Sequence, residues 1–134
     1  MIKAAATAEA STGISGLDDI LAGGLARDRV YLLEGSPGTG KTTTAMSFLR
    51  EGAKRGEASL YITLSETEEE LRDTANSHGW DLSGITIFEL VPPESLLDEQ
   101  QQSLLYSSDL ELGETTRMIF EAVERLNPTR VVIV

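Results

Sequence analysis

Apolar residues occur in two patterns along this chain: short uninterrupted runs, and segments in which they recur every three or four positions. The short runs contain many β-branched residues and predict four strands, at residues 29–33, 58–64, 85–90 and 130–134. The segments with helical spacing predict four helices, at residues 16–21, 41–53, 67–78 and 114–126. Strands that alternate with helices in this way predict an α/β fold, with a parallel sheet flanked by helices.

The first predicted helix is the shortest, and both of its ends carry signals. Ser15 and Asp18 have the spacing of a capping pair, and Gly23 and Gly24 follow as residues that commonly end helices. The residues before this helix, 1–12, are alanine-rich and predict a flexible leader. The organised part of the chain is therefore expected at residues 13–134.

Residues 91–113 carry the weakest structural signal. They contain a cluster of glutamines and no clean period, although Ser95 and Asp98 could cap a short helix. A stretch of this length without a firm element predicts a mobile or functional excursion. The last predicted strand, at residues 130–134, has the sequence RVVIV, which is typical of a strand buried on both faces.

The composition narrows the possible functions. The chain has 134 residues and a formal net charge of −11. It has no cysteine, which excludes a disulfide framework and a thiolate metal site. No apolar run is long enough to cross a bilayer, and no basic patch is visible that could neutralise nucleic-acid phosphates. We expect a cytoplasmic protein that binds neither membranes nor nucleic acid by itself, and for which a nucleotide is a suitable ligand.

A stretch rich in glycine and threonine, GSPGTGKTTT, follows the apolar run VYLLE and precedes the second predicted helix. From Gly35 to Thr42 it matches G-x-x-x-x-G-K-[ST], the pattern of a loop whose backbone N–H groups surround phosphates. Lys41 can reach the β- and γ-phosphates and act in catalysis, Thr42 offers an oxygen ligand to Mg²⁺, and Thr43 can contact the α-phosphate. The predicted nucleotide-binding residues are Gly35, Ser36, Pro37, Gly38, Thr39, Gly40, Lys41, Thr42 and Thr43.

A cluster of carboxylates follows the second predicted strand, in the sequence YITLSETEEEL. Glu66 is closest to the strand end, where phosphates bound at the carboxyl edge of a parallel sheet would meet a water-activating group. Its position is equally that of a solvated carboxylate at a strand end. The three glutamates at 68–70 fill the first turn of a helix that Thr67 begins, where negative charge is favourable and Glu70 has capping-box spacing.

Four segments, in this order and spacing, give a more specific signal than the phosphate loop alone. They are STGISGLDDILAGGL, EGSPGTGKTTTAMSFL, YITLSETEEEL followed by HGWDL, and RVVIV. In these segments the chain resembles the KaiC-like branch of the RecA-type ATPases over nearly its whole length. The resemblance implies an ATPase domain that binds Mg-ATP between subunits, commonly in a hexameric homo-oligomer. Some members of the family also phosphorylate their own serines or threonines and act in circadian timing or signalling.

Position by position, the resemblance carries the phosphate-loop roles onto Gly35, Gly38, Gly40, Lys41, Thr42 and Thr43. Glu66 matches one of two adjacent glutamates that the clock proteins carry after the second strand. Ser65 stands where the first glutamate of that pair would be, and a hydroxyl cannot serve as a carboxylate base. Water activation would therefore depend on Glu66.

The resemblance also implies that residues 13–134 are the N-terminal portion of one ATPase domain. In the family, the strand matching 130–134 is followed by an aspartate of the Mg²⁺ shell and then by a strand that lies beside the phosphate-loop strand. Neither has a counterpart in this sequence. We therefore expect a RecA-like P-loop sheet that is truncated after its fourth strand.

We expect the isolated 134-residue chain to be marginally stable or prone to aggregate. A missing interior parallel strand leaves neighbouring strand edges unpaired and apolar faces uncovered. Thermal unfolding of the purified chain tests this expectation. A cooperative melt of a monomer at a temperature usual for mesophilic proteins would contradict it.

Three functions remain open from the sequence. The first is ATP hydrolysis by the complete protein, with Lys41 required for binding and Glu66 for turnover. The second is a non-catalytic nucleotide-sensing or assembly module, which Ser65 favours. The third is a DNA-dependent, recombinase-like ATPase, which the acidic net charge disfavours. Phosphate release separates the first two, and binding to single-stranded DNA tests the third.

Overall fold

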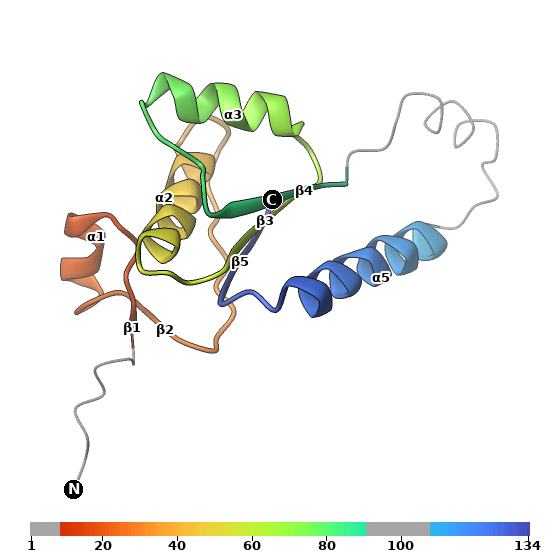
Figure 1. Cartoon of the computed structure of the whole chain (residues 1–134), viewed down its shortest axis with the longest axis horizontal. Coiled ribbons are helices and arrows are strands. Elements are labelled where there is room, and N and C mark those ends of the chain that lie inside the picture. Colours follow the sequence, from red (N-terminus) through yellow and green to blue (C-terminus); the bar gives the residue numbers. More distant parts are fainter. Residues whose placement is uncertain (1–8, 91–107) are drawn as a thin grey trace, which may run out of the picture.

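The computed structural model of the chain describes residues 9–90 and 108–134 (Figure 1). Its helices and strands are β1 (Glu9–Ala10), α1 (Ser15–Ile20), β2 (Leu25–Ala26), α2 (Lys41–Lys54), β3 (Ser59–Thr63), α3 (Glu68–Ser77), β4 (Ile85–Glu89), α5 (Ser108–Leu126) and β5 (Arg130–Ile133). A parallel sheet has the strand order β4-β3-β5, and β1 and β2 form a separate antiparallel pair. The predicted α/β fold with a parallel sheet is confirmed.

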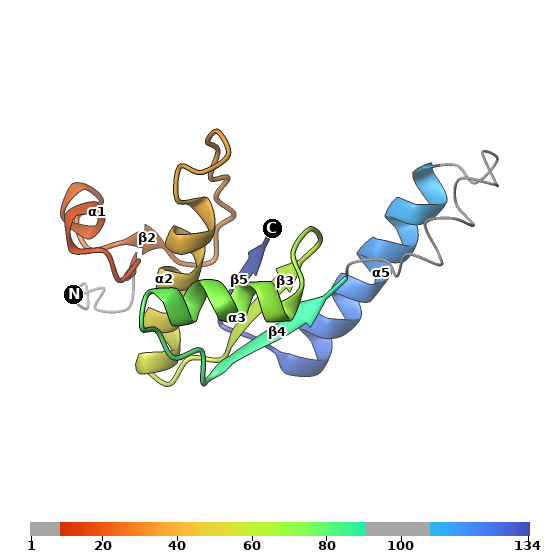
Figure 2. The same ribbon diagram turned by 90° about the horizontal axis from the view of Figure 1, so that it is seen from above.

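Helices cover both faces of the parallel sheet. Helices α2 and α3 pack on one face, against Tyr61 of β3 and the partly buried Ile87 and Val132 of its neighbours (Figure 1). Helix α5 packs on the other face, against Leu60 and Ile62 (Figure 2). The central strand β3 is buried at all five of its positions, so it forms the middle of the core.

Helix α3 begins as its sequence predicts. The Thr67 side chain accepts a hydrogen bond from the Glu70 N–H at 3.1 Å, and three glutamates lie in the first turn. Leu71 and Ala75, one turn apart, are buried in the core beside the sheet. The helix ends at Ser77, so both of its predicted boundaries are confirmed.

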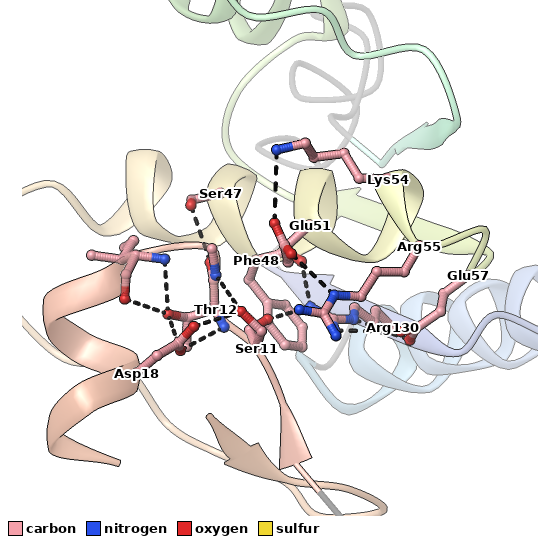
Figure 3. A network of polar contacts seen from close by, with 12 residues as sticks. Ser11, Thr12, Asp18, Ser47, Phe48, Glu51, Lys54, Arg55, Glu57 and Arg130 are labelled. Atoms are coloured by element: carbon pink, nitrogen blue, oxygen red, sulfur yellow. Dashed lines mark hydrogen bonds and ion pairs between the residues drawn. The ribbon is translucent and has the colours of Figure 1, made fainter. Parts of the chain in front are cut away.

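Residues 9–12 belong to the folded structure, so the flexible leader predicted for 1–12 does not extend to its last four positions. Ala10 pairs with Leu25 across β1 and β2, and Thr12 is buried. The Thr12 carbonyl accepts a hydrogen bond from the Ser47 hydroxyl of α2 at 3.0 Å (Figure 3). The pairing of β1 with β2 and the hydrogen bond from Ser47 hold residues 9–12 in place against α2. Neither contact produces a periodic pattern in the sequence.

The start of α1 differs from the prediction. Ile14 occupies the N-cap position with no side-chain capping bond, so Ser15 and Asp18 do not form a capping pair. Asp18 instead accepts hydrogen bonds from the Ser11 hydroxyl at 2.5 Å and from the Thr12 N–H and hydroxyl at 2.8 and 2.7 Å (Figure 3). Burial would raise the pKa of Asp18, but these hydrogen bonds outweigh it and the pKa is lowered. The Asp18 carboxylate therefore holds the segment that precedes the helix.

The strand predicted at residues 29–33 is wrong. This segment has no regular structure, and Val30 and Leu32 are 99% and 82% exposed. A β-strand needs a hydrogen-bonding neighbour, and the parallel sheet of the described residues consists of β4, β3 and β5 alone. The apolar run before the phosphate loop therefore lies outside the sheet, although its composition is typical of a buried strand.

Strand β5 is shorter and less buried than its composition predicts. Val131 and Ile133 pair in register with Leu60 and Ile62, on the face that α5 covers, yet Ile133 is 52% exposed. Helix α5 lies over β3, whereas β5 is at the edge of the sheet that the structure describes. The prediction of burial on both faces is therefore wrong for this strand, which lies at the edge of the sheet formed by the described residues.

Helix α5 begins at Ser108, before the predicted start at residue 114. The apolar residues predicted to form its inner face are buried or half-buried: Met118, Ile119, Ala122, Val123 and Leu126. The possible cap formed by Ser95 and Asp98 lies outside the described residues. None of the helices that the structure describes has the length and apolarity needed to span a membrane.

Candidate functional site

The phosphate loop predicted at residues 35–42 leads directly into α2. Gly38 and Gly40 have φ angles of +82° and +98°, in the left-handed region that favours glycine. Gly40 is the N-cap residue of α2, and no side chain caps the helix there. The Thr44 N–H donates to the Gly40 carbonyl, which is the first hydrogen bond within α2. The helical N–H groups before Thr44 have no partner within the helix, and they form the positive end of its dipole, which is suited to an anion.

The Lys41 side chain folds back onto the loop that precedes it. Its ammonium group donates hydrogen bonds to the carbonyls of Gly35 at 2.5 Å and Ser36 at 3.1 Å. The Thr39 hydroxyl donates to the same Ser36 carbonyl at 2.7 Å, which closes the turn. A phosphate would offer this cation charged acceptors, which form stronger hydrogen bonds than the two neutral carbonyls.

Glu66 reaches the start of α2 from the connection between β3 and α3. Its carboxylate accepts a hydrogen bond from the Thr42 hydroxyl at 3.3 Å. The Thr63 hydroxyl fixes the Glu66 backbone, since it accepts from the Glu66 N–H at 2.9 Å and donates to the Glu66 carbonyl at 2.8 Å. The structure thus brings together the residues that the sequence proposes as metal ligand and water-activating base.

The other residues of the carboxylate cluster lie apart from this contact. Glu68 forms an exposed pair with Arg72, one turn further along α3, at 3.0 Å. Ser65, at the position of the first glutamate of the family's pair, is exposed. Within residues 9–90 and 108–134, Glu66 is the one carboxylate hydrogen-bonded to a phosphate-loop residue. Thr43, proposed to contact the α-phosphate, is half-buried in the first turn of α2.

Tyr61 is a polar residue of this region that the sequence pattern does not single out. It is 2% exposed, on the face of β3 that α2 and α3 cover. Its hydroxyl has no hydrogen-bond partner in the part of the chain that the structure describes. Burial, and then the negative charge of Glu66, raise the pKa of Tyr61 to about 12, against the opposite effect of the Thr42 hydroxyl. The available sequence signal was a tyrosine two positions before the threonine that holds Glu66.

The residues present fit a magnesium ion that is shared with a nucleotide. Among the described residues, no group of three or more histidine, aspartate or glutamate side chains could hold a metal ion by itself. Magnesium in nucleotide sites takes one or two protein oxygens and completes its shell with phosphate oxygens and water. The Thr42 hydroxyl, with the Glu66 carboxylate beside it, supplies oxygen donors of this kind.

A parallel α/β sheet and a glycine-rich loop that opens a helix are the features of P-loop nucleotide-binding proteins. Comparison with known proteins identifies the branch within this class. The sequence model of the family described as "ATPase: KaiC" matches residues 10–133, and the chain belongs to this KaiC-type ATPase family.

Curated relatives agree with this family. A UPF0273 protein of Pyrococcus horikoshii is 31% identical over 133 residues, which cover 95% of this chain and 54% of the relative. A UPF0273 protein of Pyrococcus furiosus is 30% identical over 128 residues, covering 91% and 52% respectively. The circadian clock oscillator protein KaiC of Parathermosynechococcus lividus is 44% identical over 75 residues, covering 55% and 14%. The chain spans about half the length of the two Pyrococcus relatives it matches.

Proposed function

We propose that this chain forms the nucleotide-binding part of an enzyme that binds Mg-ATP and hydrolyses it. The observation that carries the proposal is the hydrogen bond between Thr42 and Glu66 at the open N-terminal end of α2. It lies beside a loop with the pattern of a phosphate-binding loop. Membership of the KaiC-type ATPase family supports ATP as the nucleotide.

Each group of the site has a distinct part in the proposed reaction. The loop glycines and the first N–H groups of α2 hold the phosphate chain, and Lys41 neutralises charge on its outer phosphates. Magnesium, when bound, supplies further positive charge to the phosphates. Glu66 orients a water molecule and accepts its proton as the water oxygen bonds to the terminal phosphorus. The bond from that phosphorus to the bridging oxygen breaks, and ADP leaves with the electron pair.

Glu66→Gln should separate nucleotide binding from chemistry. The amide can accept a hydrogen bond from Thr42 but cannot take a proton from water. We expect Mg-ATP affinity within about threefold of wild type and turnover lower by about a hundredfold or more. Equilibrium binding and phosphate release by the full-length native protein measure the two effects.

Glu69→Gln is the matched control for this variant. It makes the same chemical change in the first turn of α3, three positions away, at an exposed side chain. Both affinity and turnover should stay at the wild-type level in the control. Turnover in Glu66→Gln equal to that of wild type would reject Glu66 as the base.

A second candidate function is a nucleotide-sensing module that binds ATP and drives assembly without hydrolysis. Ser65 favours it, because this residue replaces a glutamate of the family pattern and leaves Glu66 to act alone. ATP that stays intact on the native protein while the oligomeric state changes would support this function and exclude catalysis.

Assembly into a homo-oligomer is part of the proposal for the complete protein. Membership of the KaiC-type ATPase family supports it. A hexameric ring, self-phosphorylation, a role in timing or signalling, and a cytoplasmic location remain predictions from the resemblance and composition. The net charge of −11 is the observation that weighs against the DNA-dependent alternative.

A further inference from the structure

Tyr61 combines burial with an unsatisfied polar group. Its ring packs in the core with Ala45, Met46 and Leu49 of α2, yet its hydroxyl has no hydrogen-bond partner among the described residues. A buried hydroxyl without a partner destabilises a folded protein, and a phenylalanine would fill the same space without that penalty. The hydroxyl therefore needs a role that the ligand-free fold does not supply.

Tyr61 lies on the face of β3 that α2 covers, against the first turns of that helix. Ala45 and Met46, which lie in the same buried cluster as the Tyr61 ring, follow Thr42 by three and four positions on α2, so the ring packs one helical turn from Thr42. Thr63, two residues further along the same face of β3, binds the Glu66 backbone through two hydrogen bonds. The strand thus presents Tyr61 and Thr63 in a row beside the Thr42–Glu66 contact.

We propose that Tyr61 is a positioning residue of this site, whose hydroxyl donates a hydrogen bond to the Thr42 oxygen when Mg-nucleotide is bound. The Thr42 hydroxyl has one proton, which it donates to Glu66, and two lone pairs. One lone pair suits a magnesium ion and the other the Tyr61 proton. Tyr61 then fixes the orientation of Thr42 and, through it, of Glu66. The inference rests on the proposed function, since it requires Mg-nucleotide at the site.

Tyr61→Phe in the full-length native protein tests this role. The measurements are the ATP dissociation constant with Mg²⁺ and with EDTA, and the melting temperature without ligand. We expect the gain in ATP affinity from Mg²⁺ to be about three- to tenfold smaller in the variant, the effect of losing one hydrogen bond. Affinity in EDTA should be unchanged, and the ligand-free melting temperature should be equal or higher.

Tyr31→Phe is the matched control. It removes a hydroxyl that accepts a hydrogen bond from the Ala26 N–H at 2.9 Å, away from the Thr42–Glu66 contact. The control should lower the ligand-free melting temperature slightly and leave the gain from Mg²⁺ at the wild-type value.

Two results would overturn the role of Tyr61. The first is an equal gain in affinity from Mg²⁺ in wild type and Tyr61→Phe. The second is a lower ligand-free melting temperature of the variant, which would mean that the hydroxyl serves the fold alone. Failure of the nucleotide binding on which this role rests has a different signature, because wild-type protein would then bind ATP in neither condition.

Discussion

Lys41→Ala is expected to weaken Mg-ATP binding by about a hundredfold or more and to abolish measurable turnover. The ammonium group lies inside the phosphate loop, where it already bonds to the carbonyls of Gly35 and Ser36. Phosphate oxygens are charged acceptors and bind such a group more strongly than carbonyls do. Without it, the phosphate charge is balanced mainly by N–H dipoles of the loop and of α2, which carry only partial charges.

Isothermal titration of the full-length native protein with Mg-ATP measures this effect. Lys54→Ala is the matched control, because it removes the same charge from the other end of α2, where Lys54 is exposed and 4.0 Å from Glu51. The control should bind as wild type does. Affinity of Lys41→Ala within about threefold of wild type would contradict the assignment of the loop as the nucleotide site.

The second large effect is expected at Arg130, which is 2% exposed at the start of β5. Its Nη1 donates hydrogen bonds to the carbonyls of Ser11 at 2.6 Å and Phe48 at 2.8 Å, and its Nε donates to Glu57 at 3.2 Å (Figure 3). The guanidinium also lies 4.6 Å from the centroid of the Phe48 ring. Gly52 leaves the necessary space, since a Cβ there would lie 2.5 Å from the Arg130 Cδ. One side chain therefore joins the N-terminal segment, α2 and the sheet.

Arg130→Ala should lower the free energy of unfolding by about 3–5 kcal/mol, the usual effect of removing one partner of a buried ion pair. The carbonyls of Ser11 and Phe48 lose the hydrogen bond from Arg130, and Glu57 keeps its ion pair with Arg27, at 3.2 Å. Urea unfolding of the native protein measures the loss. Arg117→Ala is the matched control, since Arg117 pairs with Glu121 on the exposed surface of α5 and should give no measurable change. A loss in Arg130→Ala no larger than in the control would contradict this role.

Glu57→Gln is a milder variant of the same network, and it has a pH signature. Hydrogen bonds from Arg27 and then from Arg130 lower the pKa of Glu57 below its ordinary value of 4.5, against the opposing effect of burial. Because the folded-state pKa is the lower one, the carboxylate stabilises the fold above its unfolded-state pKa, and this contribution is lost as the pH falls through the folded-state value. The stability difference between wild type and Glu57→Gln should be full at neutral pH and shrink below pH 4.5. A difference that does not change with pH would contradict it.

Features with local signals were predictable from the sequence. The Thr67 cap of α3 depends on residues three positions apart, and the buried strand β3 is set by its own apolar run. The wrong predictions concern which strands find a hydrogen-bonding neighbour in the sheet. The run at 29–33 and the last strand both prefer burial, but a preference for burial does not tell which neighbour is available to provide it. The bonds that order residues 9–12 are likewise tertiary contacts with α1, α2 and β5.

The candidate site likewise has one part that local sequence predicts and another that depends on tertiary contacts. The phosphate loop is a local motif, so its residues could be proposed from spacing alone. The Thr42–Glu66 contact joins the first turn of α2 to the connection between β3 and α3, and only the folded structure brings the two side chains within 3.3 Å. The unsatisfied hydroxyl of Tyr61 and the buried guanidinium of Arg130 could not be predicted from local patterns, because both depend on how distant segments pack.

Phosphate release from a preformed complex of the full-length native protein with Mg-ATP tests the central claim most directly. The proposed function predicts that each bound ATP gives one ADP and one phosphate, that Lys41→Ala forms no complex, and that Glu66→Gln holds its ATP intact for much longer. Wild-type protein that binds Mg-ATP tightly and returns it unhydrolysed over the same period would contradict ATP hydrolysis and leave the nucleotide-sensing function in its place.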